Sequence, residues 1–314
     1  MPKTFLVRPL LFLLVALSSA SFLRGQTPTV SFSAWVDRGE CAGVPKFATT
    51  LNGRPASVQA ELGPASNQII LIVFDLSGNL ARIEAAKQAV IANLSKLPRN
   101  AWIGLLRAQD GLHVLVDPTP NRQKVIDTIR SLSPIGTPGL LGTVRTALSL
   151  ADAMNRKYPV RVSVFYITDG SIYSYREDYT DPVINPSDPN DLSRAFPDVL
   201  IDEKISKLVR HIDALQAPLF VVQLEYRQDT LDSAYQNGLE TLTRTTGGEA
   251  AICRSMDEIP QLISRIFARI TSAWWLTLPV PAKAPKQLQI GLSASCGQGN
   301  LQLSWRSHFR LKEK

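Results

Sequence analysis

The stretch Leu71–Asn79 reads LIVFDLSGN, and it decides the fold because a run of large apolar residues ends abruptly in polar ones. An apolar run of this length is typical of a strand buried on both faces of a parallel sheet. Asp75, Ser77 and Asn79 then offer a carboxylate, a hydroxyl and an amide at every second position. Ligands of open parallel sheets bind beyond the carboxyl ends of the strands, so this strand end is the first candidate site.

A second apolar strand is predicted at Val160–Thr168, and it too ends at a carboxylate, Asp169, followed by Gly170. The usual right-handed crossovers would make the two strands neighbours and bring Asp75 and Asp169 to one edge of the sheet. Between them in sequence lies PIGTPG at residues 134–139, a stiff loop that precedes a predicted helix and carries Thr137.

Strand-like and helix-like patterns alternate from about residue 66 to residue 273. The further predicted strands cover residues 101–108, 112–117, 218–225 and 249–253, and the predicted helices cover residues 80–97, 121–132, 140–154, 199–215, 235–244 and 255–272. This alternation predicts an α/β fold, a Rossmann-like, doubly wound and mostly parallel sheet covered on both faces. The strand at 112–117 follows a hairpin turn and should be antiparallel at one edge.

Two shorter segments flank this predicted domain of residues 66–273. Residues 21–65 and 274–314 contain strand-like fragments, and we expect them to form short β extensions that pair with each other as a small module. Between residues 171 and 197 the pattern breaks into a polar loop rich in proline and tyrosine. A loop of that length is usually functional or mobile.

The first 20 residues have the pattern of a secretory signal peptide. Lys3 and Arg8 precede a short apolar core, and small residues lead to a plausible cleavage site at Ala20. No later stretch is long and apolar enough to span a membrane. We therefore expect an exported protein, periplasmic or extracellular, without a membrane span.

Composition narrows the classes of function. The chain is 45% hydrophobic and 19% charged, which is ordinary for a globular protein. Its net charge of +7 comes from scattered basic residues without interleaved aromatics, so no nucleic-acid partner is expected. The three cysteines, Cys41, Cys253 and Cys296, allow one disulfide and one remaining thiol after export. A Cys253–Cys296 bond would tie the tail to the domain, although sequence alone does not give their distance.

The residues expected at the sheet edge share one donor chemistry. They all offer oxygen, without sulfur or imidazole, and comprise Asp75, Ser77, Asn79, Thr137 and Asp169. Such a set suits a hard divalent cation, Mg²⁺ or Mn²⁺. Three of these residues also have a purely structural interpretation: Asp75 and Ser77 could cap the following helix, and Asp169-Gly170 could form a turn.

The order FDLSGN, IGTP and YITDG resembles the von Willebrand factor A domain over residues 66–273. The resemblance implies a metal-ion-dependent adhesion site of the form Asp-x-Ser-x-Ser, then Thr, then Asp-Gly. Asp75, Ser77, Thr137 and Asp169 match that motif, whereas Asn79 stands where the family has serine. The flanking stretches FATTLNGRPASVQAEL, LTRTTGGEA and SMDEIPQLISRIF look like a secreted subgroup best known from Acidobacteria.

Two functions remain open at this stage, and a third is not expected. The resemblance implies adhesion to a protein partner whose acidic side chain completes the metal shell. Alternatively, the replacement of the family's serine by Asn79 abolishes metal binding. The domain would then be a metal-free scaffold that binds its partner elsewhere, for example through Tyr173, Tyr175 and Tyr179. No motif positions a catalytic Ser/His/Asp or Cys/His set, so we expect no enzyme.

Overall fold

A computed structural model of the chain describes residues 28–311, apart from residues 40, 42, 171–196 and 298. The expected signal peptide and the tyrosine-rich loop up to residue 196 lie outside the described residues. In the part that is described, no helix is long and apolar enough to cross a membrane.

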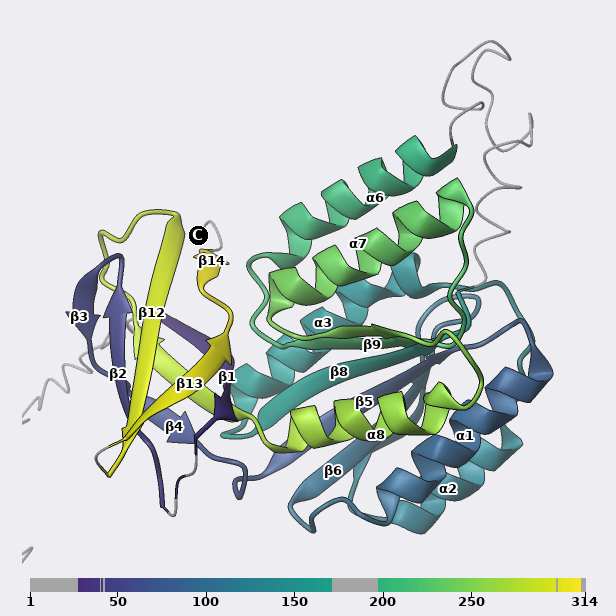
Figure 1. Cartoon of the computed structure of the whole chain (residues 1–314), viewed down its shortest axis with the longest axis horizontal. Coiled ribbons are helices and arrows are strands. Elements are labelled where there is room, and N and C mark those ends of the chain that lie inside the picture. Colours follow the sequence, from purple (N-terminus) through teal and green to yellow (C-terminus); the bar gives the residue numbers. More distant parts are fainter. Residues whose placement is uncertain (1–27, 40, 42, 171–196, 298, 312–314) are drawn as a thin grey trace, which may run out of the picture.

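A six-stranded, mostly parallel sheet forms the larger part of the molecule, as the alternating pattern predicts (Figure 1). Its order is β10-β9-β8-β5-β6-β7, and only the edge strand β7 runs antiparallel to its neighbour. The strands are β5 (Gln68–Asp75), β6 (Ala101–Arg107), β7 (His113–Thr119), β8 (Arg161–Thr168), β9 (Leu219–Gln223) and β10 (Ala250–Ile252). The prediction of an antiparallel edge at residues 112–117 is confirmed.

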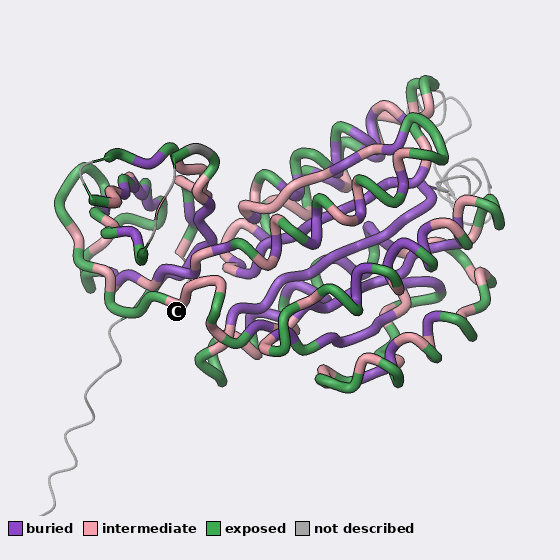
Figure 2. Tube along the Cα trace, turned by 60° about the horizontal axis from the view of Figure 1, so that its bottom comes forward, coloured by how far each residue is buried: buried purple, intermediate pink, exposed green. Residues whose placement is uncertain are grey.

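Within the described residues, three helices cover each face of this sheet. One face packs on α1 (Leu80–Leu94), α2 (Arg122–Ser131) and α8 (Glu258–Thr271), and the other on α3 (Leu140–Lys157), α6 (Pro197–Ile212) and α7 (Thr230–Thr246). Along β5, Ile70, Ile72 and Phe74 join the first core, while Leu71 and Val73 join the second. The sheet is buried between the layers, as the purple trace in Figure 2 shows. Helix α7 begins five residues earlier than predicted, because Asp229 caps it.

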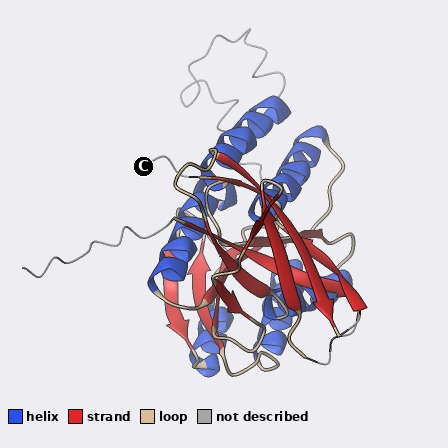
Figure 3. Ribbon diagram, turned by 90° about the vertical axis from the view of Figure 1, so that its left-hand side faces the viewer, coloured by secondary structure: helices blue, strands red, loops and turns tan. Residues whose placement is uncertain are grey.

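The two flanks pair with each other in one antiparallel sheet. The path runs β3-β2-β12-β13-β1-β11-β4, and β14 pairs with β12. Its strands are β1 (Thr29–Arg38), β2 (Lys46–Leu51), β3 (Arg54–Ala56), β4 (Ala60–Leu62), β11 (Trp274–Pro279), β12 (Gln287–Cys296), β13 (Gly299–Trp305) and β14 (His308–Arg310). We call this sheet the terminal β module; it lies in front in Figure 3. The expectation that the two ends pair with each other is confirmed.

Buried arginines join the terminal β module and its linkers to the six-stranded unit. Arg161, at the start of β8, donates to the backbone oxygens of Ala273 at 2.7 Å and Pro64 at 3.0 Å. Arg306 donates to the backbone oxygen of Leu215 at 2.5 Å and stacks on Phe309. These contacts lie at the amino ends of the parallel strands, opposite the edge where the candidate site is expected (Figure 1).

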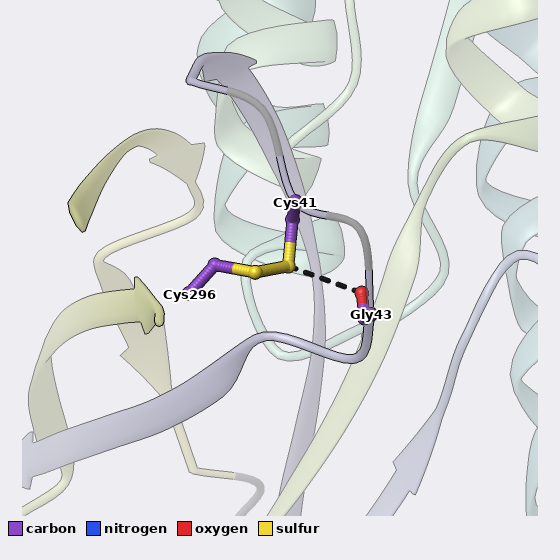
Figure 4. The surroundings of a disulfide bond; sticks show 3 residues. All are labelled: Cys41, Gly43 and Cys296. Carbon is purple, nitrogen blue, oxygen red and sulfur yellow. Dashed lines mark hydrogen bonds between the residues drawn. A yellow bond between two sulfur atoms is a disulfide. The ribbon is translucent and has the colours of Figure 1, made fainter. Parts of the chain in front are cut away.

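The disulfide joins Cys41 to Cys296, within the terminal β module (Figure 4). The expectation of a Cys253–Cys296 bond is wrong, because Cys253 follows β10 and is fully buried in the core of the six-stranded unit. Burial raises the pKa of the Cys253 thiol to about 12, so this thiol stays protonated and unreactive. Sequence spacing could not reveal the pairing, which depends on how β12 lies beside β2 and β13.

Candidate functional site

Strands β5 and β8 are adjacent and parallel, so their carboxyl ends meet. Their register places Asp75 opposite Thr168, one residue before Asp169. The Asp169 amide donates to the Asp75 backbone oxygen at 3.3 Å. The expected convergence of the two carboxylates at one edge is therefore confirmed. We call this end of the sheet, with its loops, the carboxyl edge.

The Asp75 carboxylate receives the first amides of helix α3. Its Oδ1 accepts from the Gly139 amide at 2.7 Å, and its Oδ2 accepts from the Leu140 amide and the Thr168 hydroxyl, each at 3.2 Å. Amides in the first turn of a helix have no partner within the helix, and they favour a nearby anion. A Cβ on Gly139 would lie 2.1 Å from the Ala108 backbone oxygen, so glycine is what lets this loop approach.

The charged form of Asp75 is nevertheless disfavoured by its surroundings. Burial, reinforced by the nearby negative charge of Asp169, raises the pKa of Asp75 to about 6 despite the hydrogen bonds from Gly139, Thr168 and Leu140. Removal of a carboxylate from water disfavours its charged form, and a second carboxylate adds to that effect. A cation bound between the two acids would relieve both penalties.

The Asp169 carboxylate organises the loop after β5. Its Oδ2 accepts from the Ser77 amide at 2.6 Å and from the Gly78 amide. The loop that carries Ser77 is thus pinned to the end of β8, and the two strand ends form a single unit.

The hydroxyl of Ser77 is left without a hydrogen-bond partner. Its Oγ is buried, and no described residue donates to it or accepts from it. Buried polar atoms are normally paired, so an unpaired hydroxyl beside two carboxylates calls for an explanation such as an ion or a water. This is the feature of the site that the fold alone does not explain.

Asn79 has a role in the fold. Its Oδ1 accepts from the amides of Ala81 at 3.0 Å and Arg82 at 3.2 Å, and so it caps helix α1. The structural reading that gave this cap to Asp75 or Ser77 is wrong. Whether Asn79 also binds a metal stays a prediction.

Thr137 lies in the loop before α3 and is exposed. Its amide donates to Asp110 Oδ1 at 2.9 Å, and its backbone oxygen accepts from the Asp110 amide at 3.0 Å. No hydrogen bond joins it to Asp75 or Asp169 among the described residues. Asp110, Gly139 and Thr168 shape this site and were not singled out as site residues from the sequence. Only Thr168, beside Asp169 in YITDG, had a signal that could have identified it.

The residues at the edge fit a metal in chemistry but not as a complete protein cage. Asp75, Asp169 and the Ser77 hydroxyl are the hard oxygen donors that Mg²⁺ prefers, and Mg²⁺ usually keeps several waters. Among the described residues, no group of three or more histidine, cysteine, aspartate or glutamate side chains is placed to hold a metal. A cation here would thus depend on two acids, one hydroxyl and water.

Residues 70–171 match the family model for the von Willebrand factor type A domain. The match spans strands β5 to β8 of the six-stranded unit, which we call the VWA domain after this match. The match includes all five predicted site residues. No curated protein matches the chain. The expected bacterial secreted subgroup is not confirmed by these comparisons.

Several solved structures are similar to this chain at low sequence identity. A von Willebrand factor type A protein from Catenulispora acidiphila is 11% identical, with a TM-score of 0.45, over 90% of this chain and 72% of the other. A mutant of the PilB minor pilin from Streptococcus sanguinis is 14% identical, with a TM-score of 0.49, over 70% of this chain and 64% of the other. Proximal thread matrix protein 1 from the mussel byssus, solved with a zinc-occupied MIDAS motif (the metal-ion-dependent adhesion site), is 14% identical, with a TM-score of 0.40, over 66% and 48%.

Proposed function

We propose that this protein is an exported, non-enzymatic binding protein whose VWA domain recognises a protein partner at the carboxyl edge. Asp75, Ser77 and Asp169 would hold a divalent cation, Mg²⁺ or Mn²⁺, that offers a free position to an acidic side chain of the partner. The observation that carries the proposal is the buried Ser77 hydroxyl, which has no partner in the described fold although two carboxylates lie at the same edge. The Cys41–Cys296 disulfide is consistent with export, because disulfides persist in oxidising compartments.

Exposed apolar side chains in the loops and at a helix start of the carboxyl edge support a protein partner. Leu80 is 68% exposed and Ile135 is 73% exposed, and Tyr226 and Met256 are also exposed. They follow β5, α2, β9 and β10, whose ends all lie at this edge. Large apolar residues around a polar centre are typical of protein interfaces.

A second candidate function is a metal-free scaffold for an envelope assembly. The observation that favours it is the Asn79 side chain, whose oxygen is already engaged by two helix amides. In that case the partner would bind the same fold without a cation.

The two functions differ in their need for metal. The mature chain would be immobilised and exposed to an envelope extract in Mg²⁺ or in EDTA, together with the Ser77→Ala variant. We expect a protein that is retained in Mg²⁺, released by EDTA and lost with Ser77→Ala. Retention that is equal in EDTA and in the variant would contradict the metal-dependent function and support the scaffold.

A further inference from the structure

A groove of about 510 Å³ runs between helices α3 and α6, on the flank of the VWA domain. Helix α3 lines it with residues at positions i, i+3, i+4 and i+7, namely Gly142, Arg145, Thr146 and Ser149. This spacing places all four on one helical face. Three of the four side chains are small, and a Cβ on Gly142 would meet nothing within 4 Å. The α3 side of the groove therefore leaves space for a ligand.

Helix α6 supplies the other wall with the same spacing: Lys204, Lys207, Leu208 and His211. Beneath the groove the two helices share the core that contains Leu148 of α3 and Ile205 of α6. The two helices are therefore packed together through their core-facing residues, and the groove lies between their solvent-facing residues.

The lining of the groove carries basic residues and no acid. Arg145 is exposed, and its guanidinium makes no hydrogen bond or ion pair with any described residue. Lys207 lies 2.6 Å from Glu203 one turn earlier, but both side chains are more than half exposed, and such surface pairs contribute little. The Nδ1 of His211 donates to the Lys207 backbone oxygen at 2.6 Å. Basic side chains from two helices thus face a common hollow whose own lining contains no acid.

We propose that this α3–α6 groove binds an acidic segment of a partner protein, at a site separate from the carboxyl edge. Arginine pairs with carboxylates through two parallel hydrogen bonds, and the hydroxyls of Thr146 and Ser149 can donate beside it. Leu208 gives the wall an apolar surface for the side chains between the acids. The seven-residue step from Gly142 to Ser149 is about 10 Å long, which suits a few residues of peptide rather than a long anionic polymer.

The test measures binding of a fluorescein-labelled peptide in which glutamates alternate with leucine and glycine. The groove variant is Arg145→Gln with Lys207→Gln. The matched control is Lys96→Gln with Arg99→Gln, which removes the same charge from exposed residues of the loop after α1. We expect the groove variant to bind roughly tenfold more weakly and the control to bind within about twofold of wild type. Neither EDTA nor Ser77→Ala should alter this binding, so its outcome is independent of the metal proposal.

NMR shifts caused by the peptide should cluster on residues 142–149 and 204–211. An equal loss of affinity in both double variants would show attraction by net charge alone and would overturn the proposal. The proposal would also be overturned if the wild-type protein bound a sulfated heparin fragment at the groove but did not bind the peptide. Thermal melts of each variant establish that the fold is retained.

Discussion

Asn79 stabilises helix α1 at the position where the VWA family, which this chain resembles, has a serine ligand. Its oxygen caps α1 through two amides, and Asn and Ser are both good caps, whereas Ala is poor. We expect Asn79→Ala to lower the free energy of unfolding by about 1 kcal/mol and Asn79→Ser to leave it nearly unchanged. Urea unfolding without metal measures both. Equal stability of Asn79→Ala and wild type would mean that the cap contributes nothing.

Asp232 gives the metal-free protein a pH dependence. Burial first, and then the hydrogen bond and charge of Asp229, raise the pKa of Asp232 from the usual range of an aspartate to about 7. The folded protein therefore holds this proton to higher pH than the unfolded chain. Its contribution to stability is complete below pH about 4 and is lost as the pH rises through about 7.

Asp232→Asn keeps the shape of the side chain without the titration. Urea midpoints measured from pH 4.5 to 7.5 should fall with rising pH less steeply for Asp232→Asn than for wild type. The raised pKa of Asp75 acts in the same direction in both proteins, so the difference isolates Asp232. If the urea midpoints of wild type and Asp232→Asn changed with pH in parallel, the raised pKa of Asp232 would be contradicted.

Helix α3 connects the site to the sheet through a close backbone approach. A Cβ on Gly139 would overlap the Ala108 backbone oxygen, whereas one on Gly142, one turn later, meets open space. We expect Gly139→Ala to lower the free energy of unfolding by about 1–3 kcal/mol and to weaken the site. Gly142→Ala should raise stability by about 0.5–1 kcal/mol, because alanine suits a helix interior better. Chemical denaturation decides, and loss of stability in both variants would refute the explanation by local space.

The disulfide acts at the scale of the terminal β module. It links the end of β12 to the segment after β1, 255 residues away in sequence. Cys41→Ser with Cys296→Ser should cost about 2–5 kcal/mol of stability. Calorimetry of the oxidised protein, the reduced protein and the double variant measures it. If Cys253→Ser had the same effect as the double variant, the pairing described here would be incorrect.

At the scale of the whole molecule, the terminal β module and the candidate site occupy opposite ends of the VWA domain (Figure 1). Trp35 Nε1 donates to the Arg269 backbone oxygen at 2.6 Å, and the Arg269 guanidinium lies 4.4 Å from the Trp35 ring centre. Together with Arg161 and Arg306, these contacts fix the module to the amino ends of the strands. The terminal β module is therefore attached to the end of the VWA domain opposite the carboxyl edge and does not cover that edge.

The sequence predicts what depends on local patterns. Strand ends and the hand of the crossovers were enough to bring Asp75 to Asp169, and the apolar run of β5 was enough to predict a strand buried on both faces. It could not predict which way a single side chain turns, so the cap by Asn79 and the exposed Thr137 were not foreseen. Nor could it predict the Cys41–Cys296 bond, which follows from long-range pairing of β12.

The central claim is that Asp75, Ser77 and Asp169 bind a divalent cation. The most direct measurement is a Mg²⁺ titration of the melting temperature of wild type, Ser77→Ala and, as a control, Ser206→Ala at an exposed position of α6. The Ser77 hydroxyl makes no hydrogen bond in the described fold, so Ser77→Ala should melt like wild type without metal.

With Mg²⁺ at about 100 times its dissociation constant, wild type and Ser206→Ala should each gain about 2.7 kcal/mol of stability. The gain of Ser77→Ala should be much smaller at the same concentration. A flat wild-type titration, or equal gains in wild type and Ser77→Ala, would contradict the claim.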